Sequence, residues 1–266
     1  MILIILFILG LLPLGFNPEV TPIWISKSDR AILDFDGACN VDVSGFNILY
    51  GRYNIEIYDS SNVTINNNTI RGGTRGIYAI RNGAELIYNL TISNNDVIGY
   101  FDEENWAWED IKQAPVKMDR LETSGINVKE TTDGTRIFGN NVTNWFNGIL
   151  LESYNVNHRN NNSKVYNNYL TDMADDGLEF DDYQAGFDVY NNTVTDSFIG
   201  VSIAGGNCAD LCYFRNNTLS ADGRINWDYS SYKYGECFKM GRTSYYIYNW
   251  NIDHNTCYSI RFGIVG

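Results

Sequence analysis

Short runs in which apolar and polar residues alternate make up most of the chain from about residue 35 onward. Examples are GIYAI from Gly76, GILLE from Gly148 and GVSIA from Gly200. Alternation with a period of two is typical of β-strands that bury one face. The apolar spacing of three and four residues that helices require is absent from these runs. The pattern therefore predicts an all-β protein of short strands joined by tight turns.

Two phrases recur along these strands. An Asn-rich turn, seen in NNNTIRG and YNNTVTD, has its second Asn or equivalent at residues 68, 95, 141, 168, 192, 217 and 255. Most steps are 24 to 27 residues, and two are longer, at 46 and 38. Gly-led strands interleave with the turns, at Gly76, Gly125, Gly148, Gly177, Gly200, Gly235 and Gly263.

A fixed period of short alternating strands predicts a solenoid. Inward Ile, Val, Leu and Phe would stack from coil to coil. Asn at the turn tolerates left-handed backbone geometry, and its amide can bond to the Asn of the next coil. We therefore expect a right-handed parallel β-helix over residues 21–266. The chain ends within a coil at GIVG, so further coils are expected to follow.

The Asn turns and Gly-led strands resemble the pectin-lyase-like β-helix superfamily over roughly residues 35–266. That superfamily includes pectate lyases, polygalacturonases, alginate lyases and phage tailspikes, so the resemblance implies the fold and points to polysaccharides. Asp175-Asp176 before GLEF resembles the Asp pair of polygalacturonases, and Lys239 falls where the Lys of their Arg-Ile-Lys motif would.

The chain departs from the polygalacturonase pattern at three places. Trp145-Phe146-Asn147 stands where that family has Asn-Thr-Asp, Ile199 stands where it has His, and Cys237 replaces the Arg. In that family the Arg-Ile-Lys motif grips a uronate carboxylate. The resemblance therefore implies a place for chemistry, and the missing Arg favours a neutral or differently charged glycan.

The two longer steps mark insertions that leave the solenoid at the same corner. Residues 100–124 and 219–234 both lie between an Asn turn and the next Gly-led strand. Four coil steps of about 4.8 Å separate them, giving a trough roughly 19 Å long, enough for three or four sugar rings. Long insertions in solenoids tend to lie on the binding face. The alternative is that these loops only shield the edges of the solenoid. Their aromatic residues suit sugar stacking: Trp106, Trp108, Trp227, Tyr229, Tyr232 and Tyr234.

The coil between the insertions is strongly acidic. On GLEFD, Leu178 and Phe180 are expected to point inward, so Glu179 and Asp181 would point to solvent. Carboxylates this close cannot all ionise independently. The candidate catalytic group is Asp175, Asp176, Glu179 and Asp181. Candidate substrate-binding residues lie on neighbouring coils: Glu152 one coil before, Lys129 two coils before, and Lys239 with Arg242 two coils after. The alternative is a solvated acidic rim that prevents aggregation.

Three functions fit these residues. A protonated and an ionised carboxylate are what glycoside hydrolysis requires. A Ca²⁺ bridge over oxygen ligands, with Lys or Arg as base, would suit a lyase or epimerase on uronates. The third is a non-catalytic glycan-binding or adhesive β-helix. We favour the hydrolase, because a net charge of −13 repels polyanionic substrates unless Ca²⁺ intervenes. The hydrolase requires no cofactor, and no firm metal-ligand set is predicted.

Charge and the N-terminal residues bear on partners and compartment. The excess of 32 Asp+Glu over 19 Lys+Arg argues against a nucleic-acid partner. The apolar run Ile2–Phe16 is short for a membrane span, so we expect an export signal over residues 1–20, or else an anchor or the first apolar edge of the fold. A secreted or cell-surface protein is expected. N-glycosylation sequons agree with export, at Asn62, Asn67, Asn89, Asn141, Asn161, Asn191 and Asn216.

The five cysteines are expected to form one disulfide and otherwise to remain buried thiols. Cys208 and Cys212 are close enough in sequence to close a small loop in an oxidising compartment. The other cysteines are Cys39, Cys237 and Cys257. A metal site would need more ligands nearby.

Overall fold

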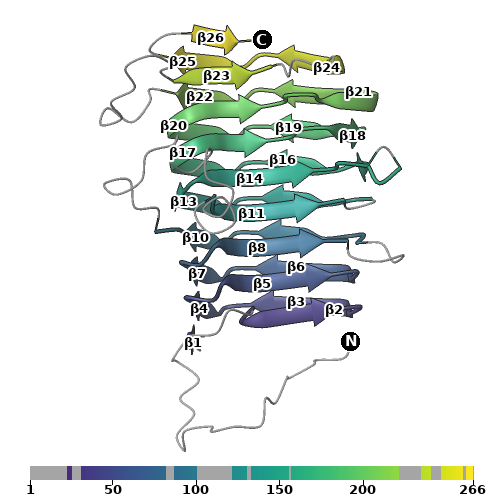
Figure 1. The fold of residues 1–266 in the computed structure, drawn as a ribbon, viewed down its shortest axis with the longest axis vertical. Coiled ribbons are helices and arrows are strands. Elements are labelled where there is room, and N and C mark those ends of the chain that lie inside the picture. Colours follow the sequence, from purple (N-terminus) through teal and green to yellow (C-terminus); the bar gives the residue numbers. More distant parts are fainter. Residues whose placement is uncertain are drawn as a thin grey trace, which may run out of the picture.

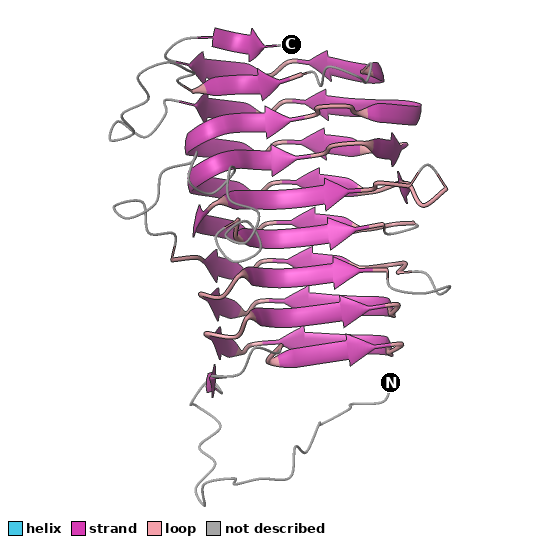
Figure 2. Cartoon of the chain, viewed as in Figure 1, coloured by secondary structure: helices cyan, strands magenta, loops and turns pink. Residues whose placement is uncertain are grey.

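The computed structural model describes residues 23–25, 31–81, 87–100, 122–130, 133–155, 157–221, 235–240, 247–259 and 262–265. These residues form a parallel β-solenoid whose coils stack along one axis, from β1 to β26 (Figure 1). They are all strands, turns and loops (Figure 2). No helix within these ranges has the length and apolarity needed to cross a membrane. The expected export signal over residues 1–20 lies outside the described residues.

The larger sheet contains two parallel series of strands that meet at a corner. The first series comprises β1 (Ile23–Ile25), β4 (Asn47–Leu49), β7 (Thr69–Arg71), β10 (Asp96–Ile98), β13 (Asn141–Trp145), β22 (Thr218–Ala221) and β25 (Thr256–Ser259). The second, which we call the Gly-led series, comprises β2 (Leu33–Asp36), β5 (Tyr53–Tyr58), β8 (Arg75–Ile80), β11 (Ser124–Lys129), β14 (Asn147–Glu152), β23 (Glu236–Lys239) and β26 (Phe262–Val265). Two longer strands, β17 (Tyr169–Glu179) and β20 (Thr193–Ser202), run through both series.

A second sheet forms the other side of the solenoid. Its strands are β3 (Cys39–Ser44), β6 (Ser61–Asn66), β9 (Thr91–Ser93), β12 (Arg136–Phe138), β15 (Asn160–Asn161), β16 (Lys164–Tyr166), β18 (Tyr183–Ala185), β19 (Asp188–Tyr190), β21 (Asn207–Arg215) and β24 (Tyr248–Asp253). Neighbouring coils pair in parallel in both sheets. The fold class predicted from the sequence is confirmed.

The glycines align as the sequence predicts, with one exception. The pairing of Ile126 with Ile149 and of Ile149 with Leu178 places Gly125, Gly148 and Gly177 side by side. A Cβ at Gly177 would lie 2.4 Å from Val194 Cγ1, so the corner is too tight for a side chain. Gly200 also aligns with Gly177, because Leu178 pairs with Val201. The β23 coil is different, because Val201 pairs with Phe238. This register puts Cys237 opposite Gly200, so the prediction for Gly235 was two residues out.

A ladder of buried asparagines runs up the inside of one turn. Each amide up to that of Asn217 donates to the side-chain oxygen of the Asn in the next coil at 2.9–3.0 Å, and each also donates to a backbone carbonyl of the coil before. The members are Asn68, Asn95, Asn140, Asn168, Asn192, Asn217 and Asn255. The predicted member Asn141 is wrong: it is exposed and bonds Asp96. Left-handed geometry belongs to the residue before each ladder Asn, such as Asn67 and Asn167.

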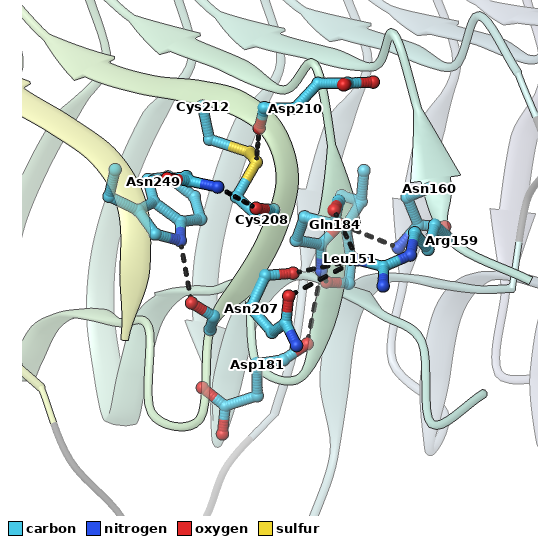
Figure 3. Close-up of a disulfide and its surroundings, with 12 residues drawn as sticks. Leu151, Arg159, Asn160, Asp181, Gln184, Asn207, Cys208, Asp210, Cys212 and Asn249 are labelled. Carbon is cyan, nitrogen blue, oxygen red and sulfur yellow. Dashed lines mark hydrogen bonds between the residues drawn. A yellow bond between two sulfur atoms is a disulfide. The ribbon is translucent and has the colours of Figure 1, made fainter. Parts of the chain in front are cut away.

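Two disulfides close the later coils. The predicted pair Cys208–Cys212 is present, and its loop lies within β21 (Figure 3). A second disulfide joins Cys237 of β23 to Cys257 of β25. The expectation of buried thiols was therefore wrong, since Cys39 is the free cysteine among the described residues and is exposed. Coil stacking brings Cys237 and Cys257 together, which spacing in the sequence does not reveal.

Candidate functional site

The outer face of the Gly-led series brings most of the predicted site residues together. Glu179 of β17 pairs with Leu150 of β14 on one side and with Ser202 of β20 on the other. Ser202 in turn pairs with Lys239. In a neighbouring column, Lys129 of β11 pairs with Glu152 of β14. The one-coil and two-coil separations expected for Glu152, Lys129 and Lys239 are confirmed.

A cavity of about 90 Å³ opens on this face across β11, β14 and β17. Its lining includes Glu179, Glu152, Lys129, Asn127 and Ser124. Four buried atoms at this cavity have no hydrogen-bond partner among the described residues: Glu179 Oε2, Asn127 Oδ1, Ser124 Oγ and Glu152 Oε2. Of these, Glu152 Oε2 forms an ion pair with Lys129. Buried polar groups normally have partners, so orphaned oxygens beside a cavity favour a ligand that donates hydrogen bonds.

The carboxyl group of Glu179 is held in its neutral form by its surroundings. Burial raises its pKa well above the ordinary value, and the nearby Asp176, Asp181 and Glu152 carboxylates raise it further. The Lys239 ammonium acts in the opposite direction and is outweighed. These surroundings therefore favour the protonated form of Glu179, which lines the cavity.

The carboxyl group of Glu152, unlike that of Glu179, is in contact with a lysine and a tyrosine hydroxyl. Its Oε2 lies 3.0 Å from Lys129 Nζ, and its Oε1 accepts a hydrogen bond of 2.8 Å from the Tyr154 hydroxyl. Lys129 Nζ also lies 5.1 Å from the centre of the Tyr154 ring. The cavity thus has two carboxyl groups with different contacts on its lining: Glu152 is paired with Lys129 and Tyr154, whereas Glu179 Oε2 has no hydrogen-bond partner.

The buried Asp176 forms an ion pair with the partly exposed Lys239 across two coils. Lys239 Nζ donates to Asp176 Oδ1 at 3.0 Å and to Oδ2 at 2.7 Å. Burial raises the pKa of Asp176 to about 7 against the effect of Lys239, and the carboxylates of Asp175 and Asp181 add to the rise. Burial alone would lower the pKa of Lys239, but Asp176 and its neighbours raise it above the ordinary value. Lys239 therefore stays a cation.

Three of the four predicted catalytic carboxylates lie away from the cavity lining. Asp175, Asp176 and Asp181 are 1%, 1% and 4% exposed. The expectation that Asp181 points to solvent was wrong. Its carboxylate accepts hydrogen bonds from Ser202 Oγ at 2.7 Å and from the Ala204 backbone at 2.9 Å, so it joins neighbouring coils. Its backbone carbonyl also accepts a bond from the buried Gln184 amide (Figure 3).

Other predicted residues lie outside the described part of the chain. These are Trp106, Trp108, Trp227, Tyr229 and Arg242, together with most of the two insertions that were expected to wall a trough. The sequence reasoning missed Asn127, Ser124 and Tyr154. Asn127 and Ser124 belong to the GINVK coil, and aligning that coil with GLEFD would have placed Asn127 two coils from Glu179.

The structure offers no ready metal site within its described ranges. No group of three or more His, Cys, Asp or Glu side chains there has an arrangement that could hold a metal ion. The Asp176 and Glu152 carboxylates are instead paired with lysines. Ca²⁺ binding therefore stays an expectation from the sequence.

Comparison with protein families agrees with this architecture. Residues 31–220 match the family described as "Right handed beta helix region". The chain therefore belongs to the right-handed β-helix family. No curated protein matches the chain.

Proposed function

We propose that the protein is an exported glycoside hydrolase that cleaves a glycan at the cavity between β11, β14 and β17. The observation that carries the proposal is the placement of two carboxyl groups on one cavity: Glu179, whose pKa is raised and whose Oε2 is buried without a hydrogen-bond partner, and Glu152, which forms an ion pair with Lys129. Export rests on the apolar run near the N-terminus.

In glycosidic hydrolysis one of the two carboxyl groups acts as the acid and the other as the base or nucleophile. Glu179 donates its proton to the glycosidic oxygen as the bond to the anomeric carbon breaks, and the leaving sugar departs as an alcohol. Glu152 removes a proton from the attacking water, or attacks the anomeric carbon itself. Asn127 and Ser124 accept hydrogen bonds from sugar hydroxyls, which supplies their missing partners.

The lysines support hydrolysis over a lyase reaction. A lyase needs a base that is free to take a proton from the substrate, whereas Lys129 and Lys239 each form an ion pair with a carboxylate. The same pairing leaves neither lysine available for a substrate carboxylate. These contacts favour a neutral glycan.

The test measures new reducing ends on a panel of neutral and acidic polysaccharides, with and without a chelator. We expect chelator-insensitive release that Glu179→Gln lowers by roughly 10²- to 10⁴-fold, because the amide cannot donate as an acid. The matched control is Glu56→Gln. Glu56 lies in the same outward column, is 7% exposed and is already bonded to Tyr58, so this variant should keep full activity.

Two results would reject the proposal. An unsaturated product that absorbs in the near ultraviolet, with release abolished by chelator, would indicate a Ca²⁺-dependent lyase. Binding of glycans without any turnover would indicate a non-catalytic β-helix.

A further inference from the structure

Two exposed tyrosines from different coils stack on each other at the corner before the Gly-led series. Tyr50 follows β4 and Tyr100 follows β10, and their ring centroids lie 5.8 Å apart with 19° between the planes. Their hydroxyl oxygens are 3.4 Å apart. The residues are 53% and 54% exposed. Together they present an aromatic surface to solvent, which we call the tyrosine pair.

The coil between them is shaped to let the two rings meet. Gly72 occupies the equivalent turn position there, with a φ of +70°. A Cβ on Gly72 would lie 3.0 Å from Tyr50 Cδ1 and 3.1 Å from Tyr100 Cδ2. Any side chain at this position would push the rings apart. The tyrosine pair therefore depends on three consecutive coils.

The backbone at Tyr50 is unfavourable for its residue type. Its φ is +64°, in the left-handed region that bulky side chains rarely adopt. The equivalent turns of later coils place Asn144, Asp172 and Asp196 there, also with positive φ. Asn and Asp tolerate this geometry, whereas a large aromatic side chain is strained in it. A strained residue that is half exposed contributes little to the core, so the strain points to a role at the surface.

We propose that the tyrosine pair is a second glycan-binding site, separate from the catalytic cavity, that holds a neutral polysaccharide. The choice of a glycan rests on the proposed function. Tyrosine rings pack against the C–H faces of sugar rings, and their hydroxyls exchange hydrogen bonds with sugar hydroxyls. The net charge of −13 disfavours an acidic polymer.

The position of the pair suits a polymer that also reaches the cavity. Gly72 precedes Arg75 by three residues, a stretch that spans at most about 10 Å. Arg75 lines the cavity and bonds the backbone carbonyl of Glu122 there. A chain bound on the tyrosines therefore lies beside the edge of the cavity and can be retained between cleavage events.

The test uses the full chain carrying Glu179→Gln, so that polymers stay intact. Affinity electrophoresis runs through gels containing galactomannan, xylan, mixed-linkage β-glucan or polygalacturonate. We expect at least one neutral polymer to retard the protein, and Tyr50→Asn to weaken this binding at least fivefold. Tyr88→Asn is the matched control, because Tyr88 is 43% exposed and bridges to Ser61 on the other sheet. It should leave the retardation unchanged.

Thermal unfolding of the same variants separates binding from a structural role. Because Asn suits left-handed geometry, Tyr50→Asn should unfold at the same or a higher temperature. A lower unfolding temperature together with lost binding would show that the pair only braces the corner, and the proposal would be rejected. Equal retardation of Tyr50→Asn, retardation by polygalacturonate alone, or no retardation would reject it too.

The outcomes also distinguish this site from the proposed activity. Retardation that depends on Tyr50, with no hydrolysis by the unsubstituted chain, would reject the hydrolase and keep the binding site. Hydrolysis that is unaccompanied by Tyr50-dependent retardation would do the reverse.

Discussion

At the scale of single residues, Glu179 and Asp176 differ in their contact with the Lys239 ammonium group. Lys239 donates hydrogen bonds to both oxygens of Asp176, whereas it acts on Glu179 through its charge. Glu179 Oε2 is instead left without a partner at the cavity. The two carboxyls lie close enough for each to affect the proton affinity of the other, because the Asp176 carboxylate raises the pKa of Glu179. The protonation state of Glu179 therefore depends on its neighbours.

This coupling predicts the pH dependence of activity. Activity requires protonated Glu179, so it should fall on the alkaline side as pH rises through the raised pKa of that group. Asp176→Asn removes a negative charge and leaves the positive charge of Lys239, and both changes lower the pKa of Glu179. The alkaline limb of kcat/KM against pH should therefore move to lower pH. An alkaline limb that stays in place in Asp176→Asn would contradict the assignment of Glu179 as the acid.

At the scale of elements, each turn depends on two adjacent residues, one with left-handed backbone geometry and one whose side chain bonds the next coil. In the turn before β7, Asn67 has a φ of +55° and is exposed, whereas Asn68 points inward and bonds Asn95. Asn-Asn dipeptides satisfy both needs. In the turn before β13 the left-handed residue is Gly139, which shifts the ladder position to Asn140.

A matched pair of variants tests this division. Asn140→Ala removes bonds to Asn168 and to the Ile92 and Phe138 carbonyls, and leaves buried groups unsatisfied. We expect it to lower the free energy of unfolding by about 2–3 kcal/mol. Asn141→Ala loses one exposed contact with Asp96 and should cost less than about 0.5 kcal/mol. Chemical denaturation measures both, and equal losses would show that the ladder has been placed one residue out.

At the scale of the whole molecule, stacking buries carboxyl groups that a single coil would leave exposed. Asp176, Glu179 and Glu56 all have raised pKa values, and burial is the largest cause in each. Asp176 and Glu179 lie within two coils of Lys239 and share its field. The solenoid therefore folds with more bound protons near neutral pH than its unfolded chain.

That difference makes stability depend on pH. An unfolded Asp titrates near 3.9, whereas Asp176 titrates at about 7 in the folded chain. Between these values the folded state binds more protons, so the free energy of unfolding should fall as pH rises from about 4 to about 7. The fall is expected to be on the order of 3 kcal/mol, and smaller in Asp176→Asn. Denaturant titrations at several pH values measure it, and a stability that rises over this range would contradict the raised pKa.

The register between coils shows which parts of the candidate site could be predicted from the sequence. Aligning strands on their glycines placed Gly125, Gly148 and Gly177 correctly, because a side chain there would collide with the next coil. The same rule failed at Gly235, where Cys237 takes the glycine position. The separations of Glu152 and Lys129 from Glu179 followed from the repeat. The burial of Asp181 did not, because it depends on Ser202 and Ala204 one coil away.

The amino-acid pattern alone determined the architecture of this protein, because alternation and the Asn turn are local signals repeated in every coil. It also determined which coils carry the acidic residues. The tertiary structure decided which carboxyl groups face the cavity, which ones pair with a lysine, and which ones hold coils together. Those outcomes depend on contacts between residues 21 to 63 positions apart, such as Asp181 with Ser202 and Asp176 with Lys239. Proton affinity likewise depends on burial by neighbouring coils that no single repeat contains.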